Sequence, residues 1–368
     1  MYRHLGAARH VIKRIPDPLH VIAVVFNPLR FVSRYNLFRE FEDHVQSNPE
    51  VVLTVVELAF GDRPFEVTQE GNPSHIQLRT SDELWHKERM INHAVSLLPH
   101  DWKYCAWVDA DVTFLNPDWA HETIQQLQHY QIVQMFTHAI DMGPNGEPTE
   151  QFEGFAYSYI TGHRQFPKLN GVDPMKKLKD KHHHHGDDDG PPEHYQPVDI
   201  NGYFYMPRWM HVVPKHVKDY YSSRYWHPGY GWAYRREAWD ALGGLLDINI
   251  VGGGDHQMAY GLIGRIEETI PAGSTDQYSK IIGNWGDNAA LIKRNIGAVP
   301  GTLTHHYHGK KSNRGYYDRW KILTENAFDP VVDIKRDWQM MWSLTGNKIE
   351  LRDQLRGYFR QRNEDSTE

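Results

Sequence analysis

The stretch that decides the fold is YCAWVDADVTFLNP, residues 104–117. An apolar, β-prone run ends in two carboxylates, Asp109 and Asp111, and breaks at Asn116-Pro117. This pattern predicts a buried strand that delivers its acidic end to the edge of a sheet, where ligands bind in open α/β folds. Mg²⁺ and Mn²⁺ prefer oxygen ligands and often share their coordination sphere with substrate phosphates. We therefore expect a metal-diphosphate site here; an acid that only caps the following turn is the alternative.

The composition favours a soluble, cytoplasmic protein. The chain has 368 residues, enough for one large α/β domain with insertions or for two modest domains. Its net charge of −7 gives no general attraction to nucleic acid or to an anionic membrane. The single cysteine, Cys105, excludes an intrachain disulfide framework. No stretch approaches the roughly 20 apolar residues of a transmembrane helix, and the basic N-terminus lacks the apolar region of a signal peptide.

Strands and helices alternate over the first 140 residues. Strands are predicted at 20–26, 51–60, 75–78, 104–108 and 132–137, and helices at 31–45, 81–98 and 118–130. Ser81 is the expected N-cap of the second helix. This alternation predicts an α/β fold with a mostly parallel central sheet and helices on both faces.

The pattern is lost between residues 141 and 200. Turn residues, a basic run at 176–181 and the low-complexity stretch 182–190 (HHHHGDDDG) predict a solvated insertion. The alternative is that an insertion of this length beside an active site selects the acceptor. Regularity returns with a strand at 202–206, helices at 235–242 and 257–263, a strand at 302–308 and a mostly helical, polar end at 333–360.

A glycine-rich turn carries the next candidate. Gly252-Gly253-Gly254 is followed at once by Asp255, at the expected start of a helix. Three glycines cost conformational entropy, so such a loop usually exists where side chains would obstruct a ligand. Asp255 is either a general base that removes a proton from an acceptor hydroxyl or simply the helix N-cap.

Histidines cluster near the end of the last predicted strand. His305, His306 and His308 lie within four positions, and imidazole suits Mn²⁺ as part of a mixed nitrogen and oxygen site. The following GKKSNRGYY, residues 309–317, could close over a diphosphate with its lysines and arginine. The alternatives are structural histidines followed by a solvated, charged turn.

The combination resembles nucleotide-sugar glycosyltransferases of the GT-A (Rossmann-like) fold, most closely the β1,4-galactosyltransferase type, over roughly residues 20–325. The matching segments are Phe26 to Arg30 (that family's Pro-Phe-Arg), Trp85 to Asn92 (Asn-Arg-Ala-Lys-Leu-Leu-Asn), Trp107 to Asp111 (Phe-Ser-Asp-Val-Asp), Tyr230 to Asp255 (Phe-Gly-Gly to Gly-Gly-Glu-Asp) and the His305 to His308 pair.

This resemblance implies the following roles and boundaries. Asp111, His305 and His308 would hold Mn²⁺ (or Mg²⁺), and Asp255 would be the catalytic base. The donor would contact Pro28, Arg30, Arg89, Asn92, Asp109, Lys310 and Arg314, and the acceptor Tyr230, Trp232, Gly253, Gly254 and His256. The parts would be a tail (1–18), a nucleotide-sugar-binding half (19–140), an insertion or acceptor loop (141–200), an acceptor and catalytic half with a lid (201–325) and a helical extension (326–368).

Two departures concern the acceptor. The family's Glu before the base is Gly254 here, and its Trp before the glycine pair is Ile250. We expect an inverting transferase that moves a sugar from a nucleoside-diphosphate sugar, UDP-sugar favoured, to a glycan or small molecule. One alternative acceptor is hydroxymethylated pyrimidine in DNA, as in phage, suggested by the basic run 176–181, the aromatic stretch 203–225 and the basic segment 352–362. A non-catalytic sugar- or nucleotide-binding module and a phosphohydrolase also fit parts of the pattern.

Overall fold

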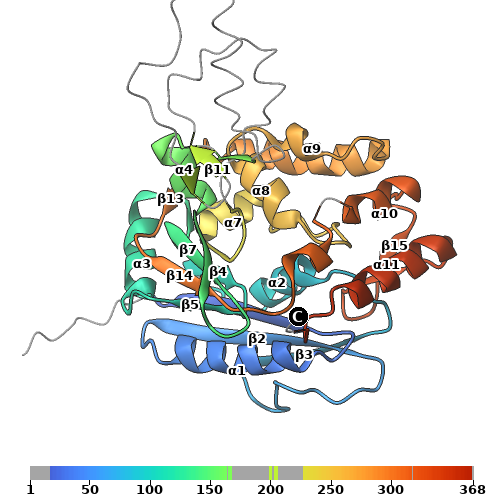
Figure 1. Ribbon diagram of the computed structural model, residues 1–368, viewed down its shortest axis with the longest axis horizontal. Helices are drawn as coiled ribbons and strands as arrows, with labels where there is room; N and C mark the ends of the chain where they lie inside the picture. The colour runs from blue at the N-terminus through green and yellow to red at the C-terminus, as the bar shows by residue number, and fades with distance from the viewer. Residues whose placement is uncertain are drawn as a thin grey trace, which may run out of the picture.

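The computed structural model describes residues 17–163, 227–316 and 318–366, together with the backbone of three short strands between residues 165 and 205. A seven-stranded sheet forms its centre (Figure 1). The strand order is β13 (Ile296–Ala298), β6 (Ile132–Gln134), β12 (Gly231–Arg235), β4 (Tyr104–Val108), β1 (Leu19–Phe26), β2 (Val51–Phe60) and β3 (His75–Thr80). Only β12 runs antiparallel to its neighbours. The predicted mixed α/β fold with a mostly parallel sheet is confirmed.

Helices cover both faces of this sheet because its central strands are apolar on both sides. The helices α1 (Val32–Gln46) and α3 (Trp119–His129) pack on one face with Ala106 and Val108 of β4. On the other face, Cys105 and Trp107 pack with residues of α2 (Lys87–Ser96), α7 (Arg236–Leu242), α8 (Gly254–Leu262) and α9 (Asp276–Ala290). The buried Cys105 is therefore a core residue.

A second, four-stranded sheet positions the candidate site. Its order is β5 (Val112–Phe114), β14 (Thr302–His305), β7 (His138–Met142) and β8 (Pro148–Glu153). In this register His305 lies opposite Val112 on one side and Asp141 on the other. The strand that follows Asp111 is thereby paired with the strand that ends in His305, which explains how two distant segments of the chain meet.

The C-terminal part contains more than helices. After η3 (Lys311–Arg314) and α10 (Arg319–Glu325), a hairpin of β15 (Ile334–Arg336) and β16 (Trp342–Leu344) precedes α11 (Ile349–Gln361). The prediction of a mostly helical segment at 333–360 is therefore wrong for its first half. No helix in the described residues is long and apolar enough to cross a membrane.

Two other elements differ from the predictions at their boundaries. The second helix begins at Lys87 with His86 at its N-cap, so Ser81 does not cap it; the preceding loop is held instead by the Trp85 amide, which donates to the Ile250 carbonyl at 2.9 Å. The strand expected at 132–137 ends at Gln134.

Regular structure also continues into the segment predicted as an insertion. This segment contains the last residues of β7, the whole of β8 and the helix α4 (Phe155–Thr161). Strand β8 pairs with β7, and α4 buries Phe155 and Ala156. Farther on, β11 (Tyr203–Tyr205) lies within the strand predicted at 202–206 and between β10 (Asp199–Ile200) and β9 (Gln165–Pro167). The basic run 176–181 and the histidine run lie outside the described residues.

Candidate active site

Three residues from distant parts of the chain form a buried group of metal-ligand type. The ligand atoms of Asp111, His305 and His308 all lie within 4.8 Å of one another. His308 Nε2 is 2.9 Å from Asp111 Oδ2, and His305 Nε2 is 3.8 Å from Asp111 Oδ1. The two Nε2 atoms are 3.3 Å apart. The structure thus brings together the three residues that the sequence resemblance assigned to the metal.

The donor set fits a divalent cation. Asp111 Oδ1 is buried without a hydrogen-bond partner among the described residues, and buried polar atoms are rarely left so. His305 Nδ1 lies 2.7 Å from Asp141, which fixes the proton on Nδ1 and turns the lone pair of Nε2 toward Asp111 and His308. One carboxylate with two imidazoles is a mixed ligand set that suits Mn²⁺.

The charge states of these groups also suit a cation. Burial by itself raises the pKa of Asp111, but His308, His305 and Arg34 hold it well below its usual range, so the carboxylate is ionised. Burial, followed by the charges of Arg314 and Arg34, lowers the pKa of His308. His308 is therefore neutral near pH 7, which is the form that binds metal.

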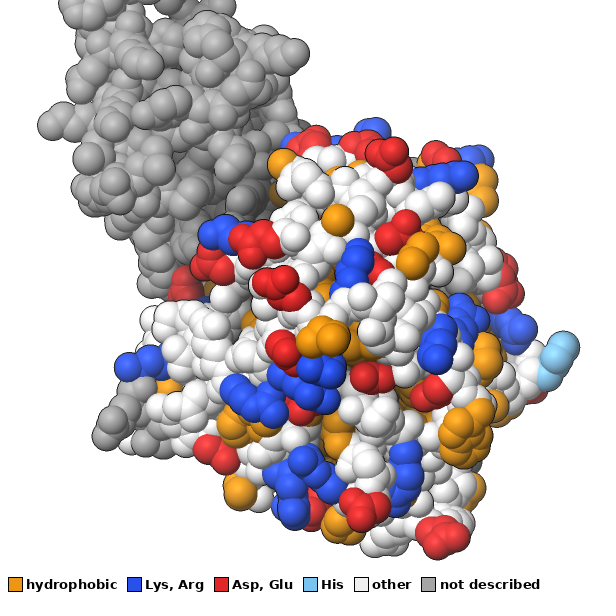
Figure 2. Space-filling model, turned by 90° about the vertical axis from the view of Figure 1, so that its right-hand side faces the viewer, with side chains coloured by type: hydrophobic (Ala, Val, Ile, Leu, Met, Phe, Trp, Pro, Cys, Tyr) orange, Lys and Arg blue, Asp and Glu red, His pale blue; other side chains and the backbone are white. Residues whose placement is uncertain are grey.

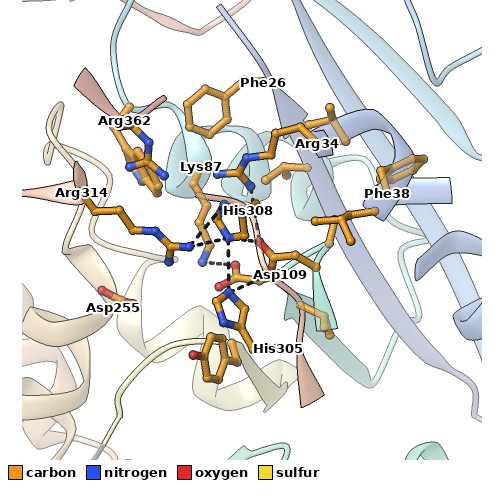
Figure 3. Close-up of a pocket in the computed structure, with 18 of the residues that line it drawn as sticks. Phe26, Arg34, Phe38, Lys87, Asp109, Asp255, His305, His308, Arg314 and Arg362 are labelled. Carbon is orange, nitrogen blue, oxygen red and sulfur yellow. Dashed lines mark hydrogen bonds and ion pairs between the residues drawn. The ribbon is translucent and has the colours of Figure 1, made fainter. Parts of the chain in front are cut away.

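A cavity opens beside this group and contains the proposed base (Figure 3). Its lining comes from the ends of β1 and β4, from α1 and α2, from the glycine-rich turn and from the C-terminal part. The lining side chains used below are Phe26, Arg34, Trp85, Lys87, Glu88, Asp109, Asp111, His227, Tyr230, Asp255, His305, His308, Arg314, Arg319 and Arg362.

Asp255 lines the cavity and is not the helix cap. The N-cap of α8 is Gly253, in the left-handed region with φ of 88°, and the Asp255 carboxylate accepts the amide of His256 at 2.8 Å. Burial raises the pKa of Asp255, but Lys87, His227 and Arg319 together lower it below its ordinary value. In Figure 3, Asp255 lies apart from His305 and His308. Because its carboxylate is ionised and faces the cavity, it can accept a proton.

A second carboxyl group, Glu88, lies next to the glycine-rich turn and was missed by the sequence reasoning. Glu88 is 4% exposed, and burial, with a further contribution from Asp255, raises its pKa to about 8. A Cβ added to Gly254 would lie 3.0 Å from Glu88 Oε1. Position 254 is therefore a glycine where a carboxyl from helix α2 occupies the adjacent space.

Lys87 links this pair to the Asp-x-Asp segment. Its ammonium forms an ion pair with Asp109 and lies 4.0 Å from the centre of the Trp107 ring. The charges of Asp109 and Asp255 raise the pKa of Lys87 in spite of its burial, so the side chain stays charged. Asp109 is thus held by Lys87 and, unlike Asp111, is not part of the three-residue ligand group.

Other expected site residues also reach the cavity. The Tyr230 hydroxyl donates to Asp141 at 3.0 Å, and its ring lies between those of His227 and His305, at 4.1 and 4.7 Å. Arg314 is buried with Nη2 3.0 Å from His308 Nε2. Gly253 lines the same cavity.

Several expected donor residues lie elsewhere. Arg89 pairs with Asp247 at 2.9 Å, and the Asn92 amide donates to the Leu245 carbonyl at 2.8 Å, so both attach α2 to the segment before the glycine-rich turn. Arg30 pairs with Glu66 at the surface, where the Pro28 carbonyl also accepts Arg63. These four residues are not in the lining of the cavity that contains Asp111 and Asp255.

Three residues expected in the lid and the acceptor site also lie away from the cavity. Lys310 is exposed, whereas the adjacent Lys311 forms ion pairs with Asp141 and Glu150. Trp232 is buried in β12 and donates to the Pro228 carbonyl at 2.7 Å. His256 packs against Tyr260, with ring centres 4.7 Å apart. Lys310, Trp232 and His256 are therefore outside the cavity lining. Local sequence did not reveal this, because it does not specify which way a side chain points.

Comparisons with known proteins give a limited likeness. No protein-family model matches the chain, and no curated protein matches it significantly. Among solved structures, a Drosophila β1,4-galactosyltransferase 7 variant with manganese, UDP-Gal and xylobiose has 9% identity and a TM-score of 0.35, over 92% of this chain and 98% of that chain.

Two bacterial enzymes give similar values. Glucosyl-3-phosphoglycerate synthase from Mycobacterium tuberculosis, with Mn²⁺, UDP and phosphoglyceric acid, has 10% identity and a TM-score of 0.35, covering 86% of this chain and 78% of that one. The 4-diphosphocytidyl-2C-methyl-D-erythritol synthase from Anaerococcus prevotii has 9% identity and a TM-score of 0.32, over 77% and 87%. Likenesses this weak carry no argument about activity, which must come from the site.

Proposed function

We propose that the protein is a metal-dependent, inverting glycosyltransferase of GT-A type. It transfers a sugar from a nucleoside-diphosphate sugar, UDP-sugar favoured, to the hydroxyl of a glycan or small molecule. The observation that carries this proposal is that one cavity contains both the Asp111, His305 and His308 group and the ionised carboxylate of Asp255. The two parts match the two needs of sugar transfer, a site for the diphosphate and a base for the acceptor.

The cations of the cavity support a diphosphate donor. Arg34, Arg314 and Arg362 line it around the metal-ligand group, and arginine binds phosphate oxygens through a planar fork of donors. Phe26 and Trp85 add flat apolar surfaces, with ring centres 5.2 Å apart. A nucleoside diphosphate combines a strong negative charge with flat rings, so it fits this lining better than a neutral sugar alone does.

The proposed chemistry needs one displacement. When bound by Asp111, His305 and His308, Mn²⁺ or Mg²⁺ supplies a Lewis acid that stabilises the negative charge of the departing diphosphate. Asp255 accepts the proton of the acceptor hydroxyl as its oxygen attacks the anomeric carbon from the face opposite the diphosphate. A single attack of this kind inverts the configuration. Glu88 has a raised pKa, so its neutral carboxyl is suited to donate a hydrogen bond to the acceptor and not to act as a nucleophile.

Among the described residues, the basic segment 352–362 gives the DNA alternative less support than its sequence suggests. Within the basic segment 352–362, Arg352 pairs with Asp353, Arg360 with Glu83 and Arg362 with Glu364. Figure 2 shows basic and acidic side chains interspersed on the face that carries α10 and α11. Binding along a DNA backbone calls for a continuous basic surface, so we favour a glycan or small-molecule acceptor.

The opposite pKa shifts of Asp255 and Glu88 also favour catalysis over simple binding. One carboxyl has a lowered pKa and its neighbour a raised pKa, an arrangement that assigns a proton acceptor and a proton donor within one site. A module that only binds sugar or nucleotide has no need of a base.

A donor screen tests the proposal. The protein is incubated with Mn²⁺ and each of several nucleoside-diphosphate sugars, together with simple glycans or hydroxymethylated DNA as acceptors. We expect release of nucleoside diphosphate that requires the metal, and an acceptor whose mass increases by one sugar. Product from the DNA arm alone would establish the alternative acceptor.

Two outcomes would contradict transfer. Release of inorganic phosphate in place of nucleoside diphosphate would indicate a phosphohydrolase. Binding of UDP without turnover of any donor, even by hydrolysis, would indicate a binding module. The variant Glu350→Gln, which changes an exposed acid of α11, serves as the matched control for the preparation.

A further inference from the structure

The segment that follows α11 returns to the candidate active site. Glu364 is 3% exposed, and its carboxylate contacts three groups of the cavity lining. It pairs with Arg34, accepts Arg362 Nε at 2.6 Å and lies 3.5 Å from His308 Nδ1. Glu364 is not itself in the lining, so it lies behind these three side chains.

The contact with His308 places a carboxylate near Nδ1, as at His305, but at a longer distance. His305 Nδ1 is 2.7 Å from Asp141, and His308 Nδ1 is 3.5 Å from Glu364. A carboxylate that accepts the proton of one ring nitrogen fixes the imidazole so that its other nitrogen can bind metal. Both imidazoles therefore have a carboxylate behind them, one from β7 and one from the segment after α11.

The two arginines gain a defined orientation from the same carboxylate. Arg34 also approaches Asp111, with Nη1 3.5 Å from Oδ2, so its guanidinium bridges Glu364 and the metal-ligand group. One carboxylate neutralises only one of two guanidinium groups, so Arg34, Arg362 and Glu364 together keep a net positive charge. Arg314, also in the lining, adds to this charge, which favours an anion in the cavity.

Neighbouring residues lock the segment in place. The Asp365 carboxylate accepts the amides of Val32 and Ser33, at 2.9 and 2.8 Å, in the first turn of α1, the helix that carries Arg34. A Cβ on Gly309 would lie 2.9 Å from the Asn363 carbonyl oxygen, and Gly309 itself has a φ of 84°. Only glycine after His308 leaves room for this close backbone approach.

From these contacts we infer that Glu364 is a positioning residue of the donor site, which holds His308, Arg34 and Arg362 in the orientations that bind the cation and the diphosphate. The inference rests on the proposed function. It gives Glu364, near the end of the described residues, a role in orienting side chains of the site that neither the metal ligands nor the base has.

The test compares Glu364→Gln with wild type and with Glu350→Gln. Free Mn²⁺ is measured by electron paramagnetic resonance, and UDP binding in the presence of Mn²⁺ by calorimetry. We expect Glu364→Gln to bind Mn²⁺ about 10- to 100-fold more weakly, as is typical when a carboxylate behind a ligating histidine is lost. UDP affinity should fall as well, while Glu350→Gln should bind both as wild type does.

A second measurement uses wild type alone and decides the question if Glu364→Gln does not fold. Because coupling is reciprocal, ligands that depend on Glu364 must stabilise the segment that carries it. Amide hydrogen exchange at residues 362–366 should therefore slow when Mn²⁺ and UDP are added, whereas exchange around Glu350 should not change.

The outcomes separate the two proposals. If wild type binds neither Mn²⁺ nor UDP, the proposed function fails. If wild type binds both, but Glu364→Gln binds them equally well or exchange at 362–366 is unaffected by the ligands, the function stands and the inference about Glu364 is overturned.

Discussion

Glu88 and Gly254 form a complementary pair, because a Cβ at Gly254 would lie only 3.0 Å from Glu88 Oε1. The carboxyl that borders the proposed base thus comes from α2, more than 150 residues away in sequence, and not from the residue that directly precedes Asp255. Two carboxyl groups of opposite pKa shift consequently share one corner of the cavity. Their different protonation states lead to the first prediction.

Asp255→Asn and Glu88→Gln should have very different effects. Asparagine cannot accept the acceptor's proton, so Asp255→Asn should lower transfer by about 10²- to 10⁴-fold and leave donor affinity nearly unchanged. Glutamine can still donate a hydrogen bond as a neutral carboxyl does, so Glu88→Gln should keep most of the activity near pH 7. Glu88→Leu, which cannot donate, should raise the acceptor KM. Both effects are measured by nucleoside diphosphate release. Equal losses in Asp255→Asn and Glu88→Gln would contradict these roles.

Alanine at the two adjacent glycines should separate stability from activity. Gly253 has a φ of 88°, and a Cβ there would lie 2.6 Å from the Trp320 ring, so Gly253→Ala should lower the free energy of unfolding by at least about 1 kcal/mol. Gly254 is helical, and the three atoms nearest to its new Cβ, at 3.0 to 3.3 Å, all belong to the flexible Glu88 side chain and not to backbone. Gly254→Ala should therefore fold well but raise the acceptor KM. Thermal melting and kinetics distinguish the two, and a reversed order would refute the packing described for this turn.

The pKa of Glu88 predicts a pH dependence of stability. It is raised from 4.5 to about 8, so between these values the folded protein holds a proton that the unfolded chain has released, and the free energy of unfolding falls as pH rises. The buried His86 and His227, with pKa values lowered from 6.5 to about 4, act in the opposite direction, because the unfolded chain still binds protons at these positions near pH 6.5.

The difference between wild type and Glu88→Gln, measured from pH 6.5 to 8, therefore isolates Glu88, because the histidines contribute equally to both proteins. The expected slope is up to roughly 1.4 kcal/mol per pH unit, the value for one proton. In urea unfolding at several pH values, the free energy of unfolding of wild type should fall more steeply with pH than that of Glu88→Gln, by up to this amount. An unchanged slope in the variant would mean that Glu88 is already ionised in the folded protein.

Removal of a metal ligand should abolish the effect of the cation on both binding and stability. Mn²⁺ at 100 times its Kd should stabilise wild type by about 2.7 kcal/mol, and a chelator should remove this stabilisation. Asp111→Ala should show neither effect and should bind UDP weakly, because Asp111 Oδ2 also lies 2.9 Å from His308. Asp255→Asn is the control that should keep the full response to Mn²⁺. If Asp111→Ala responds as wild type does, the cation binds elsewhere.

Local signals in the sequence were sufficient for five of the seven strands of the central sheet, but they did not predict β12 or β13. The apolar run before Asp109 predicted β4, and the family resemblance selected His305 and His308, which the structure places beside Asp111. Local signals failed for the helix expected from Ser81, which begins only at Lys87. They also failed for residues 141–163, where β8 and α4 depend on tertiary pairing and burial. Strand propensity and glycine or proline breaks act over a few residues, so they are readable without the fold.

Local sequence patterns did not predict the orientation of the charged side chains. Arg89 and Lys87 lie in the same turn of α2, yet Arg89 pairs with Asp247 while Lys87 faces Asp109 and the cavity.

The sequence by itself determined a mostly parallel α/β sheet and a chemistry of one Asp-x-Asp segment, paired histidines and a glycine-flanked acid. Only the tertiary structure decided which other charges complete the site. Arg34 and Glu364 are separated by 330 positions, and the half-buried Arg34 pairs with the buried carboxylate of Glu364. A buried charge depends on partners that the fold brings to it from any distance along the chain, and no local pattern specifies those partners.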